Sequence, residues 1–533
     1  MKDYKFFLFV CLFSLIFSVG TTYSQFVYEQ TFKFGRVLEW IENYYVDSVD
    51  QRTLVENAII EVLKKLDPHS SYLTKKEVKE MNEPLQGNFE GIGISFNILN
   101  DTIFVVSAIS GGPSEKVGIM AGDRIIKVEG DNVAGMGITN KDVFRLLRGD
   151  KGTKVTVTVF RRSHDKIIDF TIIRDKIPIY SVDASFKVKD DIGYIKINRF
   201  SLTTIDEFKE ALAELKMKGV NNLILDLTGN GGGYLEVAIR LADQFLDDEK
   251  LIVYTEGSNN PKRPYKATAK GDFETGNILV ITDEGSASAS EIVAGAIQDW
   301  DRGIIVGRRT FGKGLVQRPL RLPDSSMVRL TVARYYTPTG RLIQKPYNMS
   351  KDDYDKDIIN RYNNGELSHE DSIHFPDSLK FNTLKNSRVV YGGGGIMPDF
   401  FVPIDTSFYS DYYSDIVSKG ILNQFTLNYV DNNREQLKLD YPTFDVFHAN
   451  FEVSEKTINE LIKYAENENV PENKQGIEIS GIKIRLLIKA YIARDIWNTS
   501  EFYQVVNEED PGYIKAIDIL DNWEFYTALL MKK

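Results

Sequence analysis

The alternation of hydrophobic and polar positions predicts a strand, a tight turn and a helix between residues 278 and 300. The apolar run Ile278–Ile281 has the length and composition of a buried strand. Asp283, Glu284 and Gly285 interrupt this run. From Glu291 onward the apolar residues recur at helical spacing, at positions 292, 293, 296 and 297. The serines of this stretch therefore lie between the strand and the beginning of the helix.

Two interpretations of Ser288 are open from this stretch alone. Backbone N–H groups at the beginning of a helix have no intrahelical partner and favour negative charge, so an oxyanion formed by a nucleophilic serine would be stabilised there. Ser288 and Glu291 also fit a capping box, in which the serine caps the helix and the glutamate reaches back. The first interpretation predicts an active site and the second predicts only a helix cap.

A second stretch, Arg308–Gln317, follows the strand-like run at 303–307 and reads RRTFGKGLVQ. Lys313 lies between Gly312 and Gly314, where the backbone can pack closely. A lysine that is desolvated in such a place has a lowered pKa and can act as a general base. The alternative is a surface lysine in a glycine turn.

Together, SASASE at 286–291 and TFGKG at 310–314 resemble the carboxyl-terminal processing peptidases, also called tail-specific proteases. The resemblance extends from about Phe34 to Pro403. It implies that Ser288 is the nucleophile, that Lys313 is the base and that Gln317 orients the lysine. The expected activity is that of a serine-type peptidase with a Ser/Lys dyad.

The same resemblance implies an oxyanion hole. Its N–H groups would come from Gly232, with Gly231 or Gly233 as neighbours, and from Ala289. The glycine turn 228–233 departs from the family pattern at its first residue, because Thr228 stands where the family usually has arginine. This departure leaves the rigidity of the turn open.

Residues 86–176 resemble a PDZ domain, chiefly through the stretch GGPSEKVGIMAGDRIIKVEG at 111–130. A PDZ domain adds a peptide to the edge of its sheet and holds the terminal carboxylate with loop N–H groups. We expect Gly91, Ile92, Gly93 and Ile94 to form that loop. Val143 and Leu147, four positions apart on a predicted helix, would line the groove. The alternative is that these apolar residues belong only to the core.

The first 25 residues are typical of a secretory signal, with a basic start followed by an apolar run of 14 residues, Phe6–Val19. This run is short for a membrane span, which needs about 20 residues. We expect cleavage and export to a bacterial periplasm, with an uncleaved membrane anchor as the alternative. Cys11, the single cysteine, lies in this segment, so a cleaved chain would have no disulfide and no thiol nucleophile.

The expected fold class is α/β, with a crotonase-like protease core by resemblance. The chain would also contain an inserted PDZ domain, an N-terminal helical segment and a mostly helical C-terminal extension. The expected regions are a signal peptide at 1–24, an N-terminal helical region at 25–85, the PDZ domain at 86–176, the protease core at 177–403 with a surface insertion at about 348–388, and the extension at 404–533.

Composition narrows the functional classes. A formal net charge of −11 argues against a general nucleic-acid binder. No metal or cofactor is implied. The expected function is an endopeptidase of the bacterial cell envelope that recognises free, apolar C-termini of proteins or peptides through its PDZ domain, with an adaptor protein as a further candidate partner. The alternative is a catalytically inactive scaffold that binds peptides through the PDZ domain.

Overall fold

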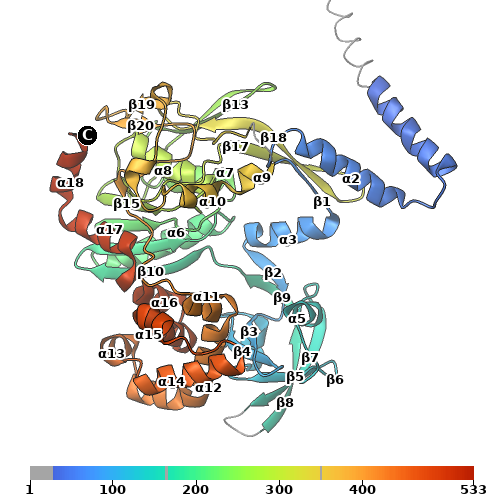
Figure 1. Cartoon of the computed structure of the whole chain (residues 1–533), viewed down its shortest axis with the longest axis vertical. Coiled ribbons are helices and arrows are strands. Elements are labelled where there is room, and N and C mark those ends of the chain that lie inside the picture. The colour runs from blue at the N-terminus through green and yellow to red at the C-terminus, as the bar shows by residue number, and fades with distance from the viewer. Residues whose placement is uncertain (1–27, 162–165, 348–350, 533) are drawn as a thin grey trace, which may run out of the picture. The chain divides into compact units, whose positions relative to one another are not determined.

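The computed structural model describes residues 28–161, 166–347 and 351–532, shown in colour in Figure 1. The predicted secretory signal and its alternative as a membrane anchor lie outside these residues. Two compact units are present: the residues up to Lys75 with Pro319–Leu330, and Lys76–Arg318 with the residues from Thr331 onward. Within the described ranges, no helix combines the length and the apolar composition that a membrane crossing requires.

The first unit is helical over residues 28–44 and over α2, Gln51–Lys64. The region that we expected to be helical also contains a strand, β1 (Ser71–Leu73), which pairs antiparallel with Met327–Arg329. A turn precedes this strand, and the Asp67 carboxylate accepts the N–H groups of His69 and Ser70 at 2.8 Å. A side chain that binds nearby backbone in this way competes with helix formation, which explains the interruption.

The second unit begins with α3 and the region where we expected the PDZ domain. Its sheet has the order β3-β4-β5-β7-β8, with β6 paired to β5, and all pairs are antiparallel. Strands β2 and β9 form a separate antiparallel pair. The elements are α3 Lys75–Gln86, β2 Asn88–Gly91, β3 Ile94–Ile98, β4 Ile103–Ala108, α4 Pro113–Val117, β5 Arg124–Val128, β6 Asp131–Asn132, α5 Asn140–Leu147, β7 Lys154–Arg161, β8 Lys166–Ile173 and β9 Asp175–Pro178.

A six-stranded sheet in the order β10-β11-β12-β15-β16-β21 forms the centre of the expected protease core. Its strands are parallel from β11 to β21, and β10 is antiparallel at one edge. Because the sheet is covered on both faces, its strands are near-continuous apolar runs, and all six residues of β11 are buried. The strands are β10 Val182–Lys189, β11 Ile192–Ile197, β12 Asn222–Asp226, β15 Asn277–Thr282, β16 Ile304–Gly307 and β21 Phe400–Phe401.

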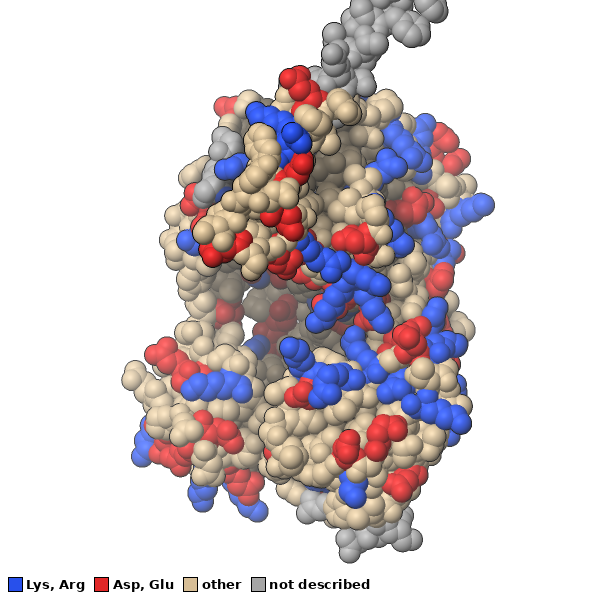
Figure 2. Space-filling model, turned by 90° about the vertical axis from the view of Figure 1, so that its right-hand side faces the viewer, with Lys and Arg blue, Asp and Glu red and all other residues tan. Residues whose placement is uncertain are grey.

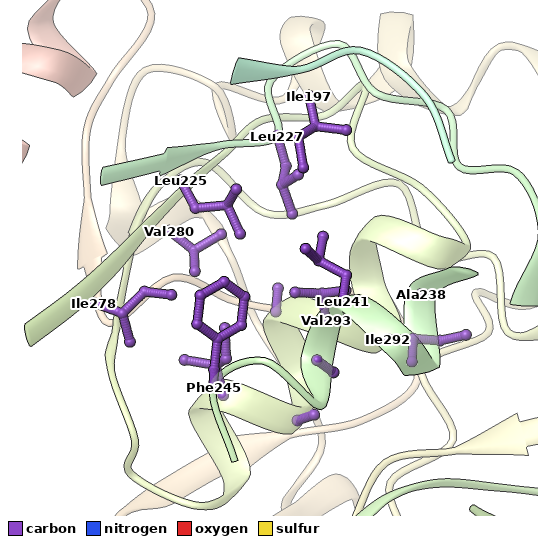
Figure 3. Close-up of a cluster of buried hydrophobic side chains, with 14 of the residues drawn as sticks. Ile197, Leu225, Leu227, Ala238, Leu241, Phe245, Ile278, Val280, Ile292 and Val293 are labelled. Carbon is purple, nitrogen blue, oxygen red and sulfur yellow. The ribbon is translucent and has the colours of Figure 1, made fainter. Parts of the chain in front are cut away.

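Three helices cover one face of this sheet: α6 (Thr204–Met217), α7 (Leu235–Ala242) and α8 (Ala289–Asp299). Figure 3 shows side chains of β11, β12 and β15 meeting side chains of α7 and α8 in one cluster. The opposite face packs against α17 (Pro511–Asp521) of the C-terminal region. The helix α8 is therefore anchored along its length, and its N-terminus lies beside the ends of the parallel strands.

The remaining elements belong to the core, its insertion and the C-terminal region. From residue 411 onward the regular elements are helices, and they gather in the orange and red part of Figure 1. The remaining bounds are β13 Leu251–Gly257, β14 Asn260–Lys266, β17 Leu315–Arg321, β18 Met327–Tyr336, α9 Lys351–Asp355, α10 Asp357–Asn363, η2 Glu370–Ser372, η3 Asp377–Leu379, β19 Lys380–Asn382, β20 Val389–Tyr391, α11 Asp411–Ser418, α12 Ile421–Asp440, α13 Phe444–Asn450, α14 Glu455–Asn467, α15 Lys474–Ile496, α16 Thr499–Val506, η4 Asn507–Glu509 and α18 Trp523–Leu530.

The face of the molecule drawn in Figure 2 carries both signs of charge, with acidic side chains beside the lysines and arginines. Nucleic-acid binding depends on a basic surface that neutralises several phosphates. This face therefore offers no uniformly basic surface of that kind.

Candidate active site

The turn that carries Ser288 follows β15 and is stabilised by the side chains of Asp283 and Ser286. The Asp283 Oδ1 atom accepts the N–H groups of Gly285 and Ser286 at 3.0 Å and that of Gly229 at 2.9 Å. The Ser286 hydroxyl donates to the carbonyl oxygen of Leu227 at 2.8 Å. Ser286 is thus a turn residue, and the serine turn is attached to the glycine turn that follows β12.

Ser288 immediately precedes α8 and has an unusual backbone conformation, with φ 56° and ψ −107°. Residues other than glycine rarely adopt positive φ, and such a conformation costs of order 1–3 kcal/mol. Strain of this kind is concentrated at active sites, and a sharp strand-to-helix turn is one way to expose a nucleophile. An ordinary helix cap has extended backbone dihedrals instead. The predicted capping box of Ser288 and Glu291 is nevertheless formed, so the two interpretations of Ser288 are compatible, and the strained backbone is the feature that a cap alone does not explain.

The Glu291 carboxylate joins the two stretches that the sequence singled out. Its Oε2 atom accepts the N–H of Ser288 at 2.7 Å and the N–H of Lys313 at 2.9 Å. Its Oε1 atom accepts the Thr310 hydroxyl at 2.6 Å and the Gly312 N–H at 2.7 Å. Glu291 is fully buried, and this burial raises its pKa, whereas the four donated hydrogen bonds oppose the rise.

A second buried group, the Tyr335 hydroxyl of β18, lies at the same junction. It is 3.0 Å from the Ser288 carbonyl oxygen and also lies within hydrogen-bonding distance of the Lys313 carbonyl oxygen. Burial raises the pKa of Tyr335 well above its usual value, so its hydroxyl stays protonated and can donate. The backbone groups of both candidate catalytic residues therefore bind the same carboxylate and the same phenol.

Lys313 lies where the sequence predicted close backbone packing. A Cβ atom added at Gly312 would come within 3.0 Å of the Gly395 nitrogen, and one added at Gly314 would come within 2.9 Å of the Gln344 nitrogen. Gly312 also has φ 88°, which side chains disfavour. Both glycines are thus required by the approach of neighbouring backbone, and Lys313 between them is half-buried.

Gln317 lies on β17, and its Nε2 atom donates long hydrogen bonds to the Leu315 carbonyl oxygen at 3.4 Å and to the Thr331 hydroxyl at 3.3 Å. These contacts hold the amide beside its own strand and β18. The orientation of Lys313 by Gln317 stays a prediction.

The glycine turn after β12 lies directly against the serine turn. A Cβ atom added at Gly232 would meet the Ala287 carbonyl oxygen at 2.8 Å, the Ser288 Cβ at 2.9 Å and the Ala289 nitrogen at 3.0 Å. Only glycine can occupy this position, which also has φ 99°. The structure therefore brings together both residues of the predicted oxyanion hole, Gly232 and Ala289.

Asn230 organises the contact between these two turns. Its Nδ2 donates to the Ile197 carbonyl oxygen at 2.8 Å, and its Oδ1 accepts the Gly232 N–H at 2.9 Å. Its carbonyl oxygen accepts the Ala287 N–H at 2.9 Å and the Ser290 hydroxyl at 2.8 Å. The predicted oxyanion donor Gly232 is thus engaged by Asn230 in this structure, and Ser290 is a structural residue of the helix start.

Thr228, where the sequence departs from the family pattern, contacts a lysine from the neighbouring strand. Lys196 of β11 is buried, and its Nζ lies 3.1 Å from Asp226 Oδ2, 3.2 Å from the Thr228 carbonyl oxygen and 2.8 Å from the Thr228 hydroxyl. The Tyr503 ring of α16 lies 5.4 Å from the same ammonium. A cation therefore holds the beginning of the glycine turn, but this cation comes from β11 and not from position 228.

The PDZ residues named from the sequence line one small pocket. Gly91, Ile92, Gly93 and Ile94 face Val143 and Leu147 of α5 across a cavity of about 40 Å³. Phe89, Phe96, Phe144 and Arg148 complete its lining. Val143 and Leu147 are also almost fully buried, so they contribute to the core of the domain as well as to the pocket. The two interpretations of these residues are therefore compatible.

Sequence reasoning missed Glu291 as a binding partner of Lys313, and it missed Asn230, Lys196 and Tyr335. The capping-box spacing was a signal for Glu291, but it indicated only the contact with Ser288. The described residues contain no group of three or more His, Cys, Asp or Glu side chains that could hold a metal ion.

Comparison with known proteins gives three matches to family models. Residues 191–353 match Peptidase family S41, and residues 104–161 match the PDZ domain. Residues 412–498 match a family of unknown function, DUF8443. The candidate Ser288 and Lys313 lie within the peptidase match.

Among curated proteins, the chain is 37% identical over 331 residues to a carboxy-terminal-processing protease of Bartonella bacilliformis, covering 61% of this chain and 75% of the relative. It is 38% identical over 314 residues to the carboxy-terminal processing protease CtpA of Bacillus subtilis, covering 59% of this chain and 66% of the relative. Among solved structures, the photosystem II D1 C-terminal processing protease is 31% identical with a TM-score of 0.34, covering 57% of this chain and 83% of that chain.

Fold, site and family-model matches define the class of the protein as a serine-type peptidase with a PDZ domain. The sequence identity of 37% to the Bartonella relative and the coverage of 75% of that relative show that the chain belongs to the family of carboxy-terminal processing proteases. The resemblance drawn from SASASE and TFGKG is thereby confirmed.

Proposed function

We propose that this peptidase cleaves peptide bonds with a dyad of Ser288 and Lys313. The Ser288 hydroxyl attacks the scissile carbonyl carbon, and neutral Lys313 accepts its proton. The C–N bond of the tetrahedral intermediate then breaks, and the lysine returns the proton to the leaving amine. Water hydrolyses the acyl-enzyme with Lys313 again as the base. Gln317 is proposed to orient the lysine.

The observation that carries this proposal is the shared carboxylate of Glu291. One buried side chain binds the backbone N–H groups of Ser288 and Lys313, although 25 positions separate these two residues in the sequence (313 − 288 = 25). A lysine that was only part of a turn would need no such connection to a strained serine. The arrangement is therefore best explained by a need to fix the two residues relative to each other.

The oxyanion is proposed to bind at the N–H of Ala289 and at an N–H of the glycine turn. Ala289 is the first residue of α8, so its N–H has no intrahelical acceptor and the helix dipole adds to its effect. The Gly232 N–H donates to Asn230 Oδ1 and must leave or share this bond to contribute. Gly231 and Gly233 present the neighbouring N–H groups.

The proposed substrates are proteins or peptides with free, apolar C-termini, captured by the PDZ domain. The pocket between Gly91–Ile94 and α5 is apolar and suits one hydrophobic side chain beside a carboxylate held by loop N–H groups. The proposed location is a bacterial periplasm, with an adaptor protein as a further partner. We also propose that the core is crotonase-like and that the helical C-terminal region is an accessory extension of it.

The alternative, an inactive peptide-binding scaffold, would be expected if the nucleophile, the lysine or the glycine turn had been lost. All three are present in the sequence. The contacts of Glu291 and Asn230 also maintain the geometry of these parts, which a scaffold would not require.

The test is turnover of an unstructured protein with an apolar C-terminus by the wild type, by Ser288→Ala and by Ser258→Ala. Ser258 is an exposed serine between β13 and β14 and serves as the matched control. We expect Ser288→Ala to lose nearly all cleavage while it unfolds at the wild-type temperature, and Ser258→Ala to cleave normally. Equal cleavage by all three proteins would show that the nucleophile lies elsewhere.

A further inference from the structure

The insertion after the core strands is more closely integrated than its polar composition suggests. We expected residues 348–388 to lie on the surface, and Ile359 and Tyr362 of α10 are indeed exposed, at 59% and 53%. Arg361, between them on the same helix, is only 2% exposed. The surface interpretation is therefore right for part of the insertion and wrong for Arg361, whose charge needs internal partners.

Those partners are backbone carbonyl groups of the stretch that contains Lys313. Arg361 Nη1 donates to the Thr310 carbonyl oxygen at 2.8 Å and, at 3.4 Å, to that of Arg309. Its Nη2 donates to the Phe311 carbonyl oxygen at 3.1 Å. A planar guanidinium with several donors suits such a row of carbonyls, and a single ammonium does not.

The same peptide segment also binds an anion. The N–H groups of Gly312 and Lys313 and the hydroxyl of Thr310 all donate to Glu291. The segment 309–313 is therefore held by a cation through its carbonyls and by a carboxylate through its N–H groups. Both contacts are charge-assisted and buried, which makes each stronger than a neutral hydrogen bond.

Other residues of the insertion support Arg361 in this position. Asp357, one turn earlier on α10, lies 3.0 Å from Arg361 Nε and 3.0 Å from Lys345 Nζ. The Tyr354 ring of α9 lies edge-on to Phe311, with 6.2 Å between centroids. The insertion thus contacts the lysine segment through a charged side chain and an aromatic one.

We propose that Arg361 is a positioning residue for Lys313, through which the insertion sets the geometry of the dyad. This inference rests on the proposed role of Lys313 as the base. Arg361 acts through the carbonyl groups of the segment whose N–H groups and Thr310 hydroxyl bind Glu291. Without the guanidinium, this segment loses three hydrogen bonds immediately before Lys313, and the lysine amine moves relative to Ser288.

The experiment compares wild type, Arg361→Met, Arg361→Lys and the control Lys356→Met in steady-state cleavage and thermal unfolding. Arg361→Met leaves Asp357 paired with Lys345, so it creates no isolated buried charge. Lys356 is an exposed residue at the beginning of the same helix. Misplacement of catalytic groups by about 1 Å can cost about 10²-fold in rate, and we expect a fall in kcat of that order for Arg361→Met.

The split between kcat and KM distinguishes positioning from a purely structural role. We expect KM to change by less than about threefold, because substrate capture is assigned to other residues. Arg361→Lys should recover part of the lost kcat, since an ammonium keeps the charge but only some of the donors. Hydrogen exchange of residues 308–314 should be faster in Arg361→Met than in Lys356→Met.

The proposal is overturned if folded Arg361→Met keeps a wild-type kcat, or if its loss lies in KM alone. If Arg361→Met does not fold, Arg361→Lys decides: wild-type kcat in this folded variant also overturns the proposal. Failure of the proposed function would look different, because wild type and Ser288→Ala would then behave alike. The exchange rates at 308–314 test the positioning by Arg361 even in that case.

Discussion

The candidate active site and the PDZ pocket are built in opposite ways. Around Ser288 and Lys313 the contacts are buried polar ones, centred on the carboxylate of Glu291 with its four donors. The PDZ pocket is lined mainly by apolar side chains such as Val143 and Leu147, which also belong to the core of that domain. The active site fixes the positions of its groups through directional hydrogen bonds, whereas the PDZ pocket provides an apolar surface of defined shape.

This difference predicts different responses to substitution. Removal of one group from a buried polar network has a large effect, because it leaves a hydrogen-bonding partner unsatisfied in a low-dielectric interior. An apolar pocket responds gradually, since each contact contributes in proportion to the area buried. Changes at the site should therefore act on kcat and be large, and changes at the pocket should act on KM and be modest.

The largest of these effects is expected for Glu291→Gln. The amide has one acceptor oxygen in place of two and turns its NH₂ group toward donors, so some of the four donors lose their acceptor. Each orphaned donor costs about 1–3 kcal/mol, and we expect kcat to fall by about 10²-fold or more. The matched control is Glu236→Gln, an exposed glutamate in the first turn of α7. Wild-type kcat in a folded Glu291→Gln protein would contradict the polar-network account.

For Lys196→Met, which removes the cation from the beginning of the glycine turn, we expect a smaller fall in kcat than for Glu291→Gln. We also expect a loss of stability. Breaking a buried ion pair destabilises by about 3–5 kcal/mol, because Asp226 is left charged and buried. The double variant Lys196→Met/Asp226→Asn should recover that stability but not the rate, since Thr228 remains released. Denaturant unfolding and kcat, measured with Lys187→Met of β10 as the exposed control, check both parts. Recovery of the full rate in the double variant would mean that Lys196 acts only on stability.

At the PDZ pocket, amidation of the substrate's C-terminus should raise KM with little effect on kcat. Hydrogen bonds to a charged acceptor are about twice as strong as neutral ones, so a rise of about fivefold is expected. Steady-state cleavage of paired free-acid and amide peptides measures it. Equal KM values for the two peptides would place C-terminal recognition outside this pocket.

The smallest expected effect is that of chelators and thiol reagents on cleavage, for which we expect none. The dyad needs no metal, and the one cysteine of the chain is Cys11, in the predicted signal. The measurement is residual activity after incubation with each reagent. Loss with a chelator that zinc restores would contradict the proposed mechanism.

Local periodicity explains what the sequence could predict. The apolar run Ile278–Ile281 lies within β15, and the strand-like run at 303–307 contains β16, because apolar runs are properties of neighbouring residues. The close backbone packing beside Lys313 could likewise be predicted, because such packing restricts positions 312 and 314 to glycine.

The second contact of Glu291 could not be predicted in the same way. Its partners Gly312 and Lys313 donate through backbone N–H groups, which every residue except proline has. Arg361 was missed for a related reason, since its partners are carbonyl oxygens and its neighbours in the sequence are polar. Long-range contacts to backbone atoms leave no residue pattern, and the supports of this site consist largely of such contacts.

Lys313→Arg tests the Ser/Lys dyad most directly. Arginine keeps the charge and most of the length of lysine but does not lose its proton in proteins, so it cannot act as the base. The measurements are the cleavage rate and the unfolding temperature of wild type and variant, side by side. General acid–base catalysis contributes about 10²–10⁴-fold, and we expect at least this loss with unchanged unfolding. A Lys313→Arg protein that unfolds like wild type and cleaves within about tenfold of it would contradict the dyad.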